Sequence, residues 1–343
     1  ESAPDSLWAI PARYNEGVLI IRGQEISLGG DVGRVLTFGL DTALTGWDAG
    51  VEWFARRLES SGATGIIAHP RSPRTRDSWR PGSMLGIVGW EAFDFADIGR
   101  TRLAGPWAVY HLLSLAVSVP LGRTDQSLLR LYREGFHQPA VAAFDSLYAS
   151  RPLPPLNPLS PMTALAGLDV HPKARVAGGL IPGYGPFFRS LVNHIELSQP
   201  LARDPRAAAR ALAEGLAAGR VFISFGNTSG ARSFVWSALP PGGSDPRTEP
   251  PPVARWRPGF KLRAGFLGQS VKRLAYRVVR DGVTVVWIRG PELAWPVEAP
   301  GAYRVEVYQY SLRVGRLFWN LRPWIFSNPI RLRGNDASGR GSR

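Results

Sequence analysis

The chain has 343 residues, no cysteine, 30 prolines, 38 glycines and a formal net charge of +14. The absence of cysteine excludes a disulfide framework, a thiolate metal site and a thiol nucleophile. The length favours two domains, and a content of 20% charged and 10% aromatic residues excludes wholesale disorder. The positive charge is concentrated late in the chain. Residues 223–343 contain 19 lysines and arginines against 7 acidic residues, whereas residues 1–222 contain 22 against 20.

The first two thirds of the chain alternate between short apolar runs and helical patterns, which is typical of an α/β domain. Asp48 is placed to cap a helix whose apolar side chains Val51, Phe54, Ala55 and Leu58 share one face. A second helix is predicted to start at Asp204-Pro205 and to stop at Gly219. The runs that we predict as strands are residues 18–21, 35–40, 65–68, 84–88 and 165–168.

The longest apolar run, residues 107–121, contains His111 and Pro120. It falls short of the roughly 18 residues that a membrane-spanning helix needs. We therefore predict a buried helix here and no transmembrane segment.

From Val221 onward the pattern changes to short alternating runs separated by glycine and proline turns. Asp281-Gly282 lies between two such runs and predicts a tight hairpin. This pattern of short alternating runs and turns favours a β-sandwich over residues 223–330. The polar, basic residues 331–343 are expected to form a disordered tail.

Several of the predicted strands end at ionisable residues: His69, Glu91, Asp169 and His171. Strand ends that deliver such residues are typical of an α/β barrel, whose active site lies at the carboxyl rim. Asp169 and His171 are two residues apart, so an extended backbone puts both side chains on one face. Together with Glu25 they form a ligand set that suits zinc, manganese or iron. Each residue also has an ordinary alternative role, as a turn, a core contact or a solvated strand end.

Five segments in order carry a family resemblance: Gly23-x-Glu25-Ile26-Ser27, Gly33-x-Val35-Leu36-x-x-Gly39-Leu40, Ile66-Ile67-Ala68-His69-Pro70, Trp90-Glu91-x-Phe93-Asp94 and Gly167-Leu168-Asp169-Val170-His171. With Gly219–Ser224 and the closing Pro323–Ile330, they resemble the polymerase and histidinol phosphatase (PHP) superfamily. The match is to its metal-dependent phosphoesterase-like hydrolases with a C-terminal β domain, and it runs from about residue 16 to residue 330.

The resemblance implies a distorted (β/α) PHP-like barrel over residues 1–222, N-terminally incomplete, followed by the C-terminal β-sandwich domain. It implies that Glu25 is a bridging carboxylate and that His69, Asp169 and His171 are metal ligands, with Glu91 as a further candidate at the same rim. The implied cofactor is a divalent metal, zinc, manganese or iron. The implied chemistry is hydrolysis of a phosphoester or related ester by metal-bound hydroxide.

The sequence departs from this family at two ligand positions. The family opens with a His-x-His strand, whereas no histidine precedes Glu25 in this chain. The family also has a histidine after the glycine at Gly33, where this chain has Arg34. An N-terminally incomplete chain would explain the first departure but not the second, because a guanidinium does not ligate a metal. We therefore expect an incomplete, degraded metal site.

The basic C-terminal region offers a possible docking surface in which positive and aromatic side chains interleave. Such a surface suits a protein partner or an anionic membrane surface, and we rank nucleic acid below both because no nucleic-acid-binding motif is present. The alternative is a half-buried strand whose aromatic side chains pack inward while its arginines are solvated. The candidate docking residues are Arg313, Arg316, Trp319, Arg322 and Trp324.

Two functions follow. The first is a metal-dependent hydrolase acting on a small phosphoester or ester substrate. The second is a non-catalytic accessory or assembly subunit that docks on a protein complex or an anionic membrane surface through its basic C-terminal domain. An exported or membrane-peripheral location is compatible with both.

Overall fold

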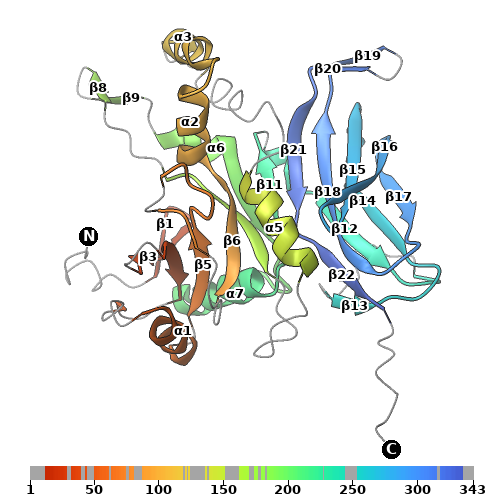
Figure 1. The fold of residues 1–343 in the computed structure, drawn as a ribbon, viewed down its shortest axis with the longest axis horizontal. Helices are drawn as coiled ribbons and strands as arrows, with labels where there is room; N and C mark the ends of the chain where they lie inside the picture. Colours follow the sequence, from red (N-terminus) through yellow and green to blue (C-terminus); the bar gives the residue numbers. More distant parts are fainter. Residues whose placement is uncertain are drawn as a thin grey trace, which may run out of the picture. The chain divides into compact units, whose positions relative to one another are not determined.

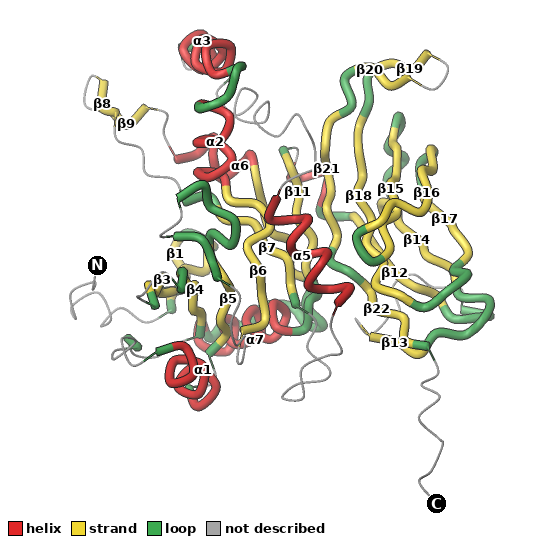
Figure 2. Tube along the Cα trace, viewed as in Figure 1, coloured by secondary structure: helices red, strands yellow, loops and turns green. Residues whose placement is uncertain are grey.

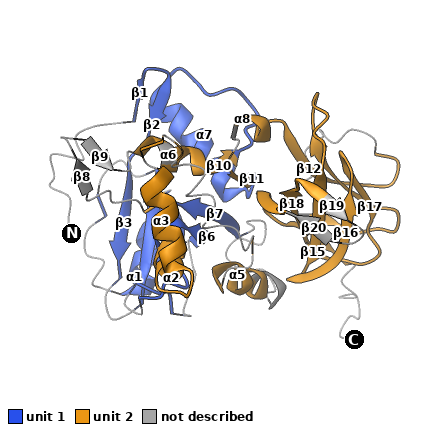
Figure 3. Cartoon of the chain, turned by 90° about the horizontal axis from the view of Figure 1, so that it is seen from above, with its two compact units in different colours: residues 1–97, 153–167, 195–221 blue, residues 98–152, 168–194, 222–343 orange. Residues whose placement is uncertain are grey.

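The computed structural model describes residues 12–28, 32–39, 43–44, 50–61, 63–74, 77–80, 87–118, 120–121, 123, 136, 139–150, 162–169, 174–176, 179–181, 184–226, 228–243, 253–314 and 317–334. They form a mixed α/β fold with several sheets (Figure 1) that divides into two units (Figure 3). Unit 1 comprises Glu1–Asp97, Leu153–Gly167 and Ile195–Val221. Unit 2 comprises Ile98–Pro152, Leu168–His194 and Phe222–Arg343. No helix within the described ranges is long and apolar enough to cross a membrane.

The centre of unit 1 is a five-stranded sheet with the order β3-β4-β5-β6-β7 (Figure 2). β4 runs antiparallel to β3 and to β5, whereas β5, β6 and β7 are parallel. A hairpin of β1 and β2 precedes the sheet. The strands of unit 1 are β1 (Arg13–Asn15), β2 (Val18–Ile20), β3 (Gly23–Ser27), β4 (Arg34–Phe38), β5 (Thr64–Ala68), β6 (Ile87–Asp94) and β7 (Thr163–Gly167).

Two helices of unit 1 form where local signals predict them. α1 (Val51–Ser60) buries Phe54, Ala55 and Leu58 on one face, as expected, while Asp48 lies outside the described residues. α7 (Pro205–Ala217) begins with proline, and the side chain of Asp204 accepts the N–H of Ala207 at 2.9 Å. Both features satisfy what an isolated helix start needs, so the sequence alone locates α7.

One strand prediction in unit 1 was wrong in its boundaries. The strand expected over residues 84–88 is β6, which runs from Ile87 to Asp94. Its last six residues are all buried, and this continued burial extends the strand past the expected end. Glu91 therefore lies inside β6, and the residue at the carboxyl end of the strand is Asp94 rather than Glu91.

The predicted (β/α) barrel is not shown by the structure. Among the described residues the five-stranded sheet stays open, with β3 at one edge and β7 at the other. A barrel of this class needs parallel neighbours throughout, whereas β4 is antiparallel to both of its neighbours.

Unit 2 contains an eight-stranded sheet and a three-stranded sheet that contribute to one hydrophobic core. The large sheet has the order β10-β11-β21-β18-β15-β16, with β13 and β22 attached, and the small sheet has the order β12-β14-β17. Its core strands are β10 (Leu191–Ile195), β11 (Val221–Phe225), β12 (Phe234–Leu239), β13 (Val253–Arg255), β14 (Lys261–Phe266), β15 (Leu274–Arg280), β16 (Val283–Arg289), β17 (Leu293–Pro296), β18 (Gly301–Gln309), β21 (Arg322–Ser327) and β22 (Ile330–Arg333). The prediction of a disordered tail from residue 331 onward was wrong for residues 331–333, because β22 pairs with β13 and β18 and buries Leu332.

The hairpin predicted at Asp281-Gly282 is confirmed. The two residues connect β15 and β16 and have φ values of 49° and 82°. Positive φ at both positions is what a type I′ turn requires, and aspartate followed by glycine tolerates it.

The remaining elements of unit 2 are helices and two small hairpins. α2 (Phe95–Leu103) contains the boundary between the units, since Asp97 closes a segment of unit 1 and Ile98 opens one of unit 2. The others are α3 (Ala108–Ser118), α5 (Pro139–Ser150), α6 (Tyr184–Ser190), α8 (Thr228–Ala231), β8 (Ala174–Val176), β9 (Gly179–Ile181), β19 (Leu312–Val314) and β20 (Leu317–Trp319).

The prediction of a buried helix over residues 107–121 was wrong. α3 occupies this stretch, but Trp107, Val109, Leu113 and Val117 are all at least 60% exposed. Its buried positions are His111 and Ser118. An apolar sequence therefore predicted the helix correctly and its environment incorrectly.

The candidate docking surface is corrected at Trp324. Its side chain is buried in the core of unit 2 and stacks on Phe266 with ring centroids 4.5 Å apart, so it cannot dock a partner. Arg322, two residues earlier on β21, is exposed. These two positions follow the alternative of inward aromatics and solvated arginines. Arg316 lies outside the described residues, as do the side chains of Arg313 and Trp319.

Candidate functional site

His69 lies immediately after β5, at the carboxyl end of a fully buried strand. Its backbone is in the left-handed region, with φ of 48°, and its carbonyl accepts the N–H of Ser72 at 3.1 Å. The tight turn holds the imidazole inside unit 1, where it is buried. A left-handed conformation is unfavourable for a residue with a side chain, and such strain concentrates at functional sites.

Glu91 supports this turn from the neighbouring strand β6. Its Oε2 accepts the backbone N–H of His69 at 2.8 Å, and the residue is 4% exposed. On the other side of β6, Gly167 of β7 leaves the space that the carboxyl group occupies, because a Cβ at Gly167 would collide with Glu91 Oε1. A glycine at this position is therefore part of the site.

Asp94 and Asp97 bring two further carboxylates to the imidazole, from the end of β6 and the first turn of α2. Asp94 Oδ1 accepts the N–H of Asp97 at 2.6 Å, as a helix-capping side chain does, while Oδ2 lies 3.3 Å from His69 Nδ1. Asp97 Oδ1 accepts the hydroxyl of Ser72 at 3.0 Å, and Oδ2 lies 3.2 Å from His69 Nδ1. Each aspartate thus uses one oxygen for the local fold and turns the other toward the imidazole.

The electrostatics of this cluster favour protons, and hence positive charge. Burial lowers the pKa of His69, but the hydrogen bond with Asp97 and the charges of Glu91, Asp94 and Asp97 outweigh it and raise the pKa to about 9. Burial and the charge of Asp94 raise the pKa of Glu91 to about 8, against the opposing charge of His69. The carboxylates thus stabilise a positive charge on His69, and a metal ion bound by this imidazole would have to displace its proton.

Glu25 reaches the same imidazole from β3, but it is shared with an arginine. Its Oε1 lies 3.7 Å from His69 Nε2 and 2.8 Å from Arg34 Nη1. Arg34 also places Nη2 at 2.9 Å from Asp77 Oδ1. The guanidinium therefore bridges Glu25 and Asp77 at the position where the family resemblance leads one to expect a metal-ligating histidine.

The donor set around His69 fits a divalent metal ion in kind. One imidazole and the carboxylates of Glu91, Asp94 and Asp97 are ligand types that zinc, manganese and iron accept. The three carboxylates approach the same nitrogen, Nδ1, at 3.2 to 3.9 Å. Glu25 fits less well, because its oxygen already accepts a hydrogen bond from Arg34.

Of the residues predicted as ligands, the structure brings Glu25, His69 and Glu91 together in unit 1. Asp169 belongs to unit 2, where its Oδ2 lies 3.3 Å from Arg100 Nη2, and it has a left-handed backbone with φ of 40°. His171 lies outside the described residues. That Asp169 and His171 complete the ligand set stays a prediction.

Sequence reasoning missed Asp94 and Asp97. The available signal was the spacing Glu91-x-x-Asp94-x-x-Asp97, which continues past the expected strand end. Ser72 was missed as well, since its role depends on the turn that follows His69.

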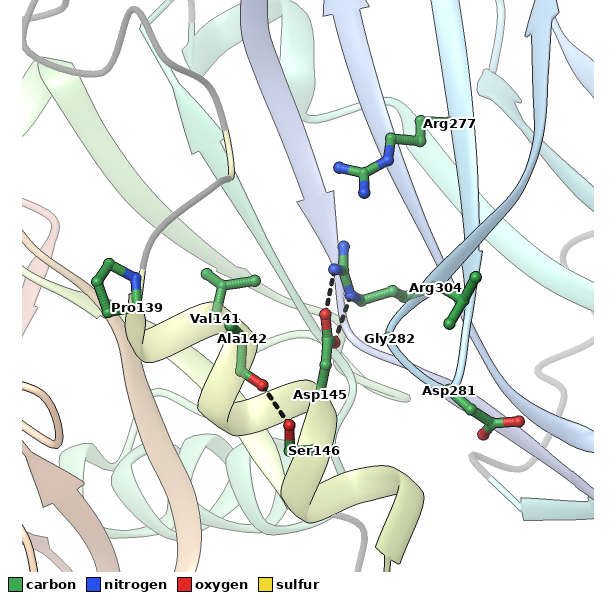
Figure 4. Close-up of a pocket in the computed structure, with 10 residues that line it drawn as sticks. Pro139, Val141, Ala142, Asp145, Ser146, Arg277, Asp281, Gly282 and Arg304 are labelled. Atoms are coloured by element: carbon green, nitrogen blue, oxygen red, sulfur yellow. Dashed lines mark hydrogen bonds and ion pairs between the residues drawn. The ribbon is translucent and has the colours of Figure 1, made fainter.

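Unit 2 contains a second buried charge cluster, beside a pocket of about 660 Å³ (Figure 4). Arg304 donates to both carboxylate oxygens of Asp145, at 2.8 and 2.6 Å, and to Glu306. Arg277 donates to Glu306 at 2.9 Å. Glu306 also accepts the hydroxyl of Tyr308 at 2.7 Å. The charged groups of this cluster are engaged with one another, so we assign it to the packing of α5 against the sheet.

No family model matches the chain, and neither a curated protein nor a solved structure is similar to it. The site is therefore interpreted from its own residues.

Proposed function

We propose that unit 1 binds one divalent metal ion between His69 and the surrounding carboxylates, and that the protein uses it to hydrolyse a phosphoester or related ester. The observation that carries the proposal is the convergence of Asp97, Asp94 and Glu91 on His69 Nδ1 within 3.2 to 3.9 Å in a buried site. A metal ion in such a site activates water and neutralises charge that develops on an ester oxygen.

The residues of the chain have distinct tasks in this proposal. His69, Asp94 and Asp97 would hold the ion, because Asp94 Oδ2 and Asp97 Oδ2 are the carboxylate oxygens nearest to His69 Nδ1, at 3.3 and 3.2 Å. Glu91 fixes the turn of His69 through its backbone N–H and adds a buried negative charge. Ser72 orients Asp97 through its second oxygen, as outer-shell hydrogen bonds commonly do for metal ligands.

The proposal also has more specific parts: the chain belongs to the PHP superfamily, its fold is a distorted barrel, and Asp169 and His171 take part in metal binding. They rest on the order of motifs in the sequence. The consequence of Arg34 is a site for one ion rather than two or three, since Glu25 is held by the guanidinium.

Metal content after loading tests the proposal. The purified chain is stripped with a chelator, incubated with zinc, manganese or iron(II), desalted and analysed for metal. One equivalent is expected for the wild type and a loss of at least about a hundredfold in affinity for His69→Ala. His194→Ala is the matched control. His194 of unit 2 is partly buried, and its imidazole shares a side-chain hydrogen bond with the hydroxyl of Ser224 at 2.8 Å.

Hydrolysis is measured on the same samples with p-nitrophenyl phosphate, bis-p-nitrophenyl phosphate and p-nitrophenyl acetate. Turnover that requires the loaded metal and is lost in Asp94→Asn supports the hydrolase. Retention of metal without turnover removes the catalytic half of the proposal, and a failure to retain any of the three metals removes it entirely.

A second candidate function is a non-catalytic accessory or assembly subunit, and Arg34 favours it. A guanidinium that bridges Glu25 and Asp77 supplies by itself the positive charge that a second ion would bring. In this case the chain docks on a protein complex or an anionic surface through its basic C-terminal region. Absence of metal and of turnover, together with a preserved fold in His69→Ala, would favour this candidate.

A further inference from the structure

Helix α3 of unit 2 has its polarity reversed relative to an ordinary surface helix. The exposed positions Val109, Leu112, Leu113, Ala116 and Val117 follow the i, i+3, i+4, i+7, i+8 spacing of a single helix face. The buried positions are His111 and Ser118. An amphipathic helix normally buries its apolar stripe and exposes its polar stripe. α3 instead exposes its apolar stripe, which therefore lacks the apolar contacts that such a stripe normally makes.

The exposed face is large and contains no charge. Trp107, Val109, Leu113 and Val117 have exposed fractions of 67%, 68%, 61% and 60%. No Asp, Glu, Lys or Arg occurs between Arg102 and Arg123, and His111, which does, is buried. Single exposed apolar residues need no explanation, but a contiguous set on one helix marks a surface that contacts something apolar.

We propose that α3 inserts its exposed face into the interfacial region of an anionic lipid membrane. An 11-residue helix is about 16 Å long, which is too short to span a hydrocarbon core of about 30 Å but sufficient to lie in the plane of the surface. Trp107 and Tyr110 stand at the amino end of the helix, and aromatic residues of this type favour the level of the lipid headgroups.

The charges around α3 select an anionic surface rather than another apolar protein face. Arg123, which is exposed, follows the uncharged stretch, and Arg102, which is half-buried, precedes it. Arg100 is already paired with Asp169 at 3.3 Å, so it adds little to this positive charge. The chain as a whole carries a net charge of +14, most of it within residues 223–343. Positive charges near the end of an apolar in-plane helix strengthen binding to acidic headgroups and leave its apolar face free to insert.

Vesicle flotation tests the proposal with the full chain. The expected result is binding to vesicles of phosphatidylcholine with about 30% phosphatidylglycerol, weaker binding to pure phosphatidylcholine, and weakening by added salt. The double variant Leu113→Glu/Val117→Glu should lower the affinity at least about tenfold, because it places charges on the inserted face. Both positions are exposed, so the variant should fold like the wild type.

The matched control is Val283→Glu/Leu312→Glu, which changes two side chains of similar exposure, 67% and 59%, elsewhere in unit 2. This control should bind vesicles like the wild type. A Trp107→Phe variant identifies the fluorescence of Trp107, which should shift to the blue and be quenched by brominated lipid.

Three results would overturn the proposal. The wild type does not float with anionic vesicles, the α3 variant binds as well as the wild type, or the control variant alone loses binding, which would place the lipid contact on the strands. A concentration-dependent dimer that Leu113→Glu/Val117→Glu abolishes, without any vesicle binding, would assign the face to a second copy of the chain instead.

Discussion

Each unit of the protein contains a buried cluster of charged side chains, and the two clusters differ in how they are compensated. In unit 2 burial opposes ionisation of Glu306, yet Arg304 and Arg277 lower its pKa, and Glu306 and Asp145 in turn raise the pKa of Arg304. In unit 1 the pKa values of both His69 and Glu91 rise. In unit 2 each acidic group faces a guanidinium, which stays protonated, whereas in unit 1 three carboxylates surround a single imidazole, which can lose its proton.

The two clusters also differ in the distances between their charged atoms. The contacts in unit 2 are direct, at 2.6 to 2.9 Å between guanidinium nitrogens and carboxylate oxygens. In unit 1 the carboxylate oxygens stand 3.2 to 3.9 Å from His69 Nδ1. The carboxylate oxygens of the unit 2 cluster are thus paired one to one with guanidinium nitrogens, whereas in unit 1 one hydrogen bond, with Asp97 Oδ2 at 3.2 Å, and two longer approaches converge on the same nitrogen.

The strongest test removes the cation of the structural cluster. Arg304→Met leaves Glu306 and Asp145 buried with less compensation, so the free energy of unfolding of unit 2 should fall by about 3–5 kcal/mol. Arg263→Met is the control, because Arg263 pairs with Glu292 at the surface, with 35% and 61% of the two side chains exposed. It should change stability by less than about 1 kcal/mol.

Urea denaturation followed by far-UV circular dichroism measures both variants. If Arg304→Met were as stable as the control, the cluster of unit 2 would not stabilise the packing of this unit. A ligand for the adjacent pocket should then be sought.

A pH series on isosteric variants sharpens the contrast in unit 2. Glu306 has a folded-state pKa below its usual value of 4.5, so its ionised form contributes stability above that value and loses it as pH falls through the lower folded-state pKa. Glu306→Gln should therefore cost on the order of 3 kcal/mol at neutral pH, with the cost shrinking in acid. Equal cost at all pH values would contradict the charge pairing.

The same substitution in unit 1 should behave in the opposite way when the protein is free of metal. Asp94, Glu25 and His69 face Glu91, and its pKa is raised to about 8, so folding favours its protonated form. That contribution is fully present below the usual value of 4.5 and is lost as pH rises from 4.5 to about 8. Glu91→Gln should match the wild type below about pH 4.5, should gain stability over it progressively as pH rises from 4.5 to about 8, and should keep that gain in more alkaline solution. Thermal unfolding with a chelator present measures it, and a gain in acid would refute the assignment.

Local signals were sufficient to predict several elements from the sequence. The capping aspartate and first-turn proline of α7 and the Asp281-Gly282 turn act within a few residues, so they do not depend on distant contacts. The strands β5 and β15 could also be predicted from the sequence, since they are short apolar runs with turns nearby.

Features that depend on packing could not be predicted. The end of β6 moved to Asp94 because burial continues past Trp90, and only this shift brings Asp94 and Asp97 to His69. The apolar character of α3 did not reveal that its face is exposed, and the aromatic character of Trp324 did not reveal that it is buried. The antiparallel placement of β4, which opens the expected barrel, is a long-range pairing that periodicity does not report.

The space reserved by Gly167 gives a test of intermediate size. Gly167→Ala forces its Cβ into Glu91 Oε1, so the carboxyl must move away from the turn of His69. The expected result is a loss of about 1–3 kcal/mol in stability and of at least about tenfold in metal affinity. Gly99→Ala is the control, because a Cβ there has no heavy atom within 4 Å and alanine is favoured in a helix.

Isothermal titration with zinc and urea denaturation measure the two effects. Unchanged metal affinity in Gly167→Ala, with reduced stability, would remove Glu91 from the supporting shell of the site and leave the aspartates as its only carboxylates.

The smallest expected effect concerns the arginine that holds Glu25. Arg34→His replaces the guanidinium by an imidazole, removes the ion pairs that Glu25 and Asp77 make with Arg34, and supplies a donor atom beside them. A second, weaker equivalent of zinc should then bind, which analysis of metal content resolves from the first. Arg56→His is the matched control, since Arg56 is 70% exposed on α1 and approaches Glu52 only at 3.9 Å. If Arg34→His binds no additional metal, the guanidinium is not what limits the site to one ion, and the limit lies in the positions of Glu25 and Asp77 themselves.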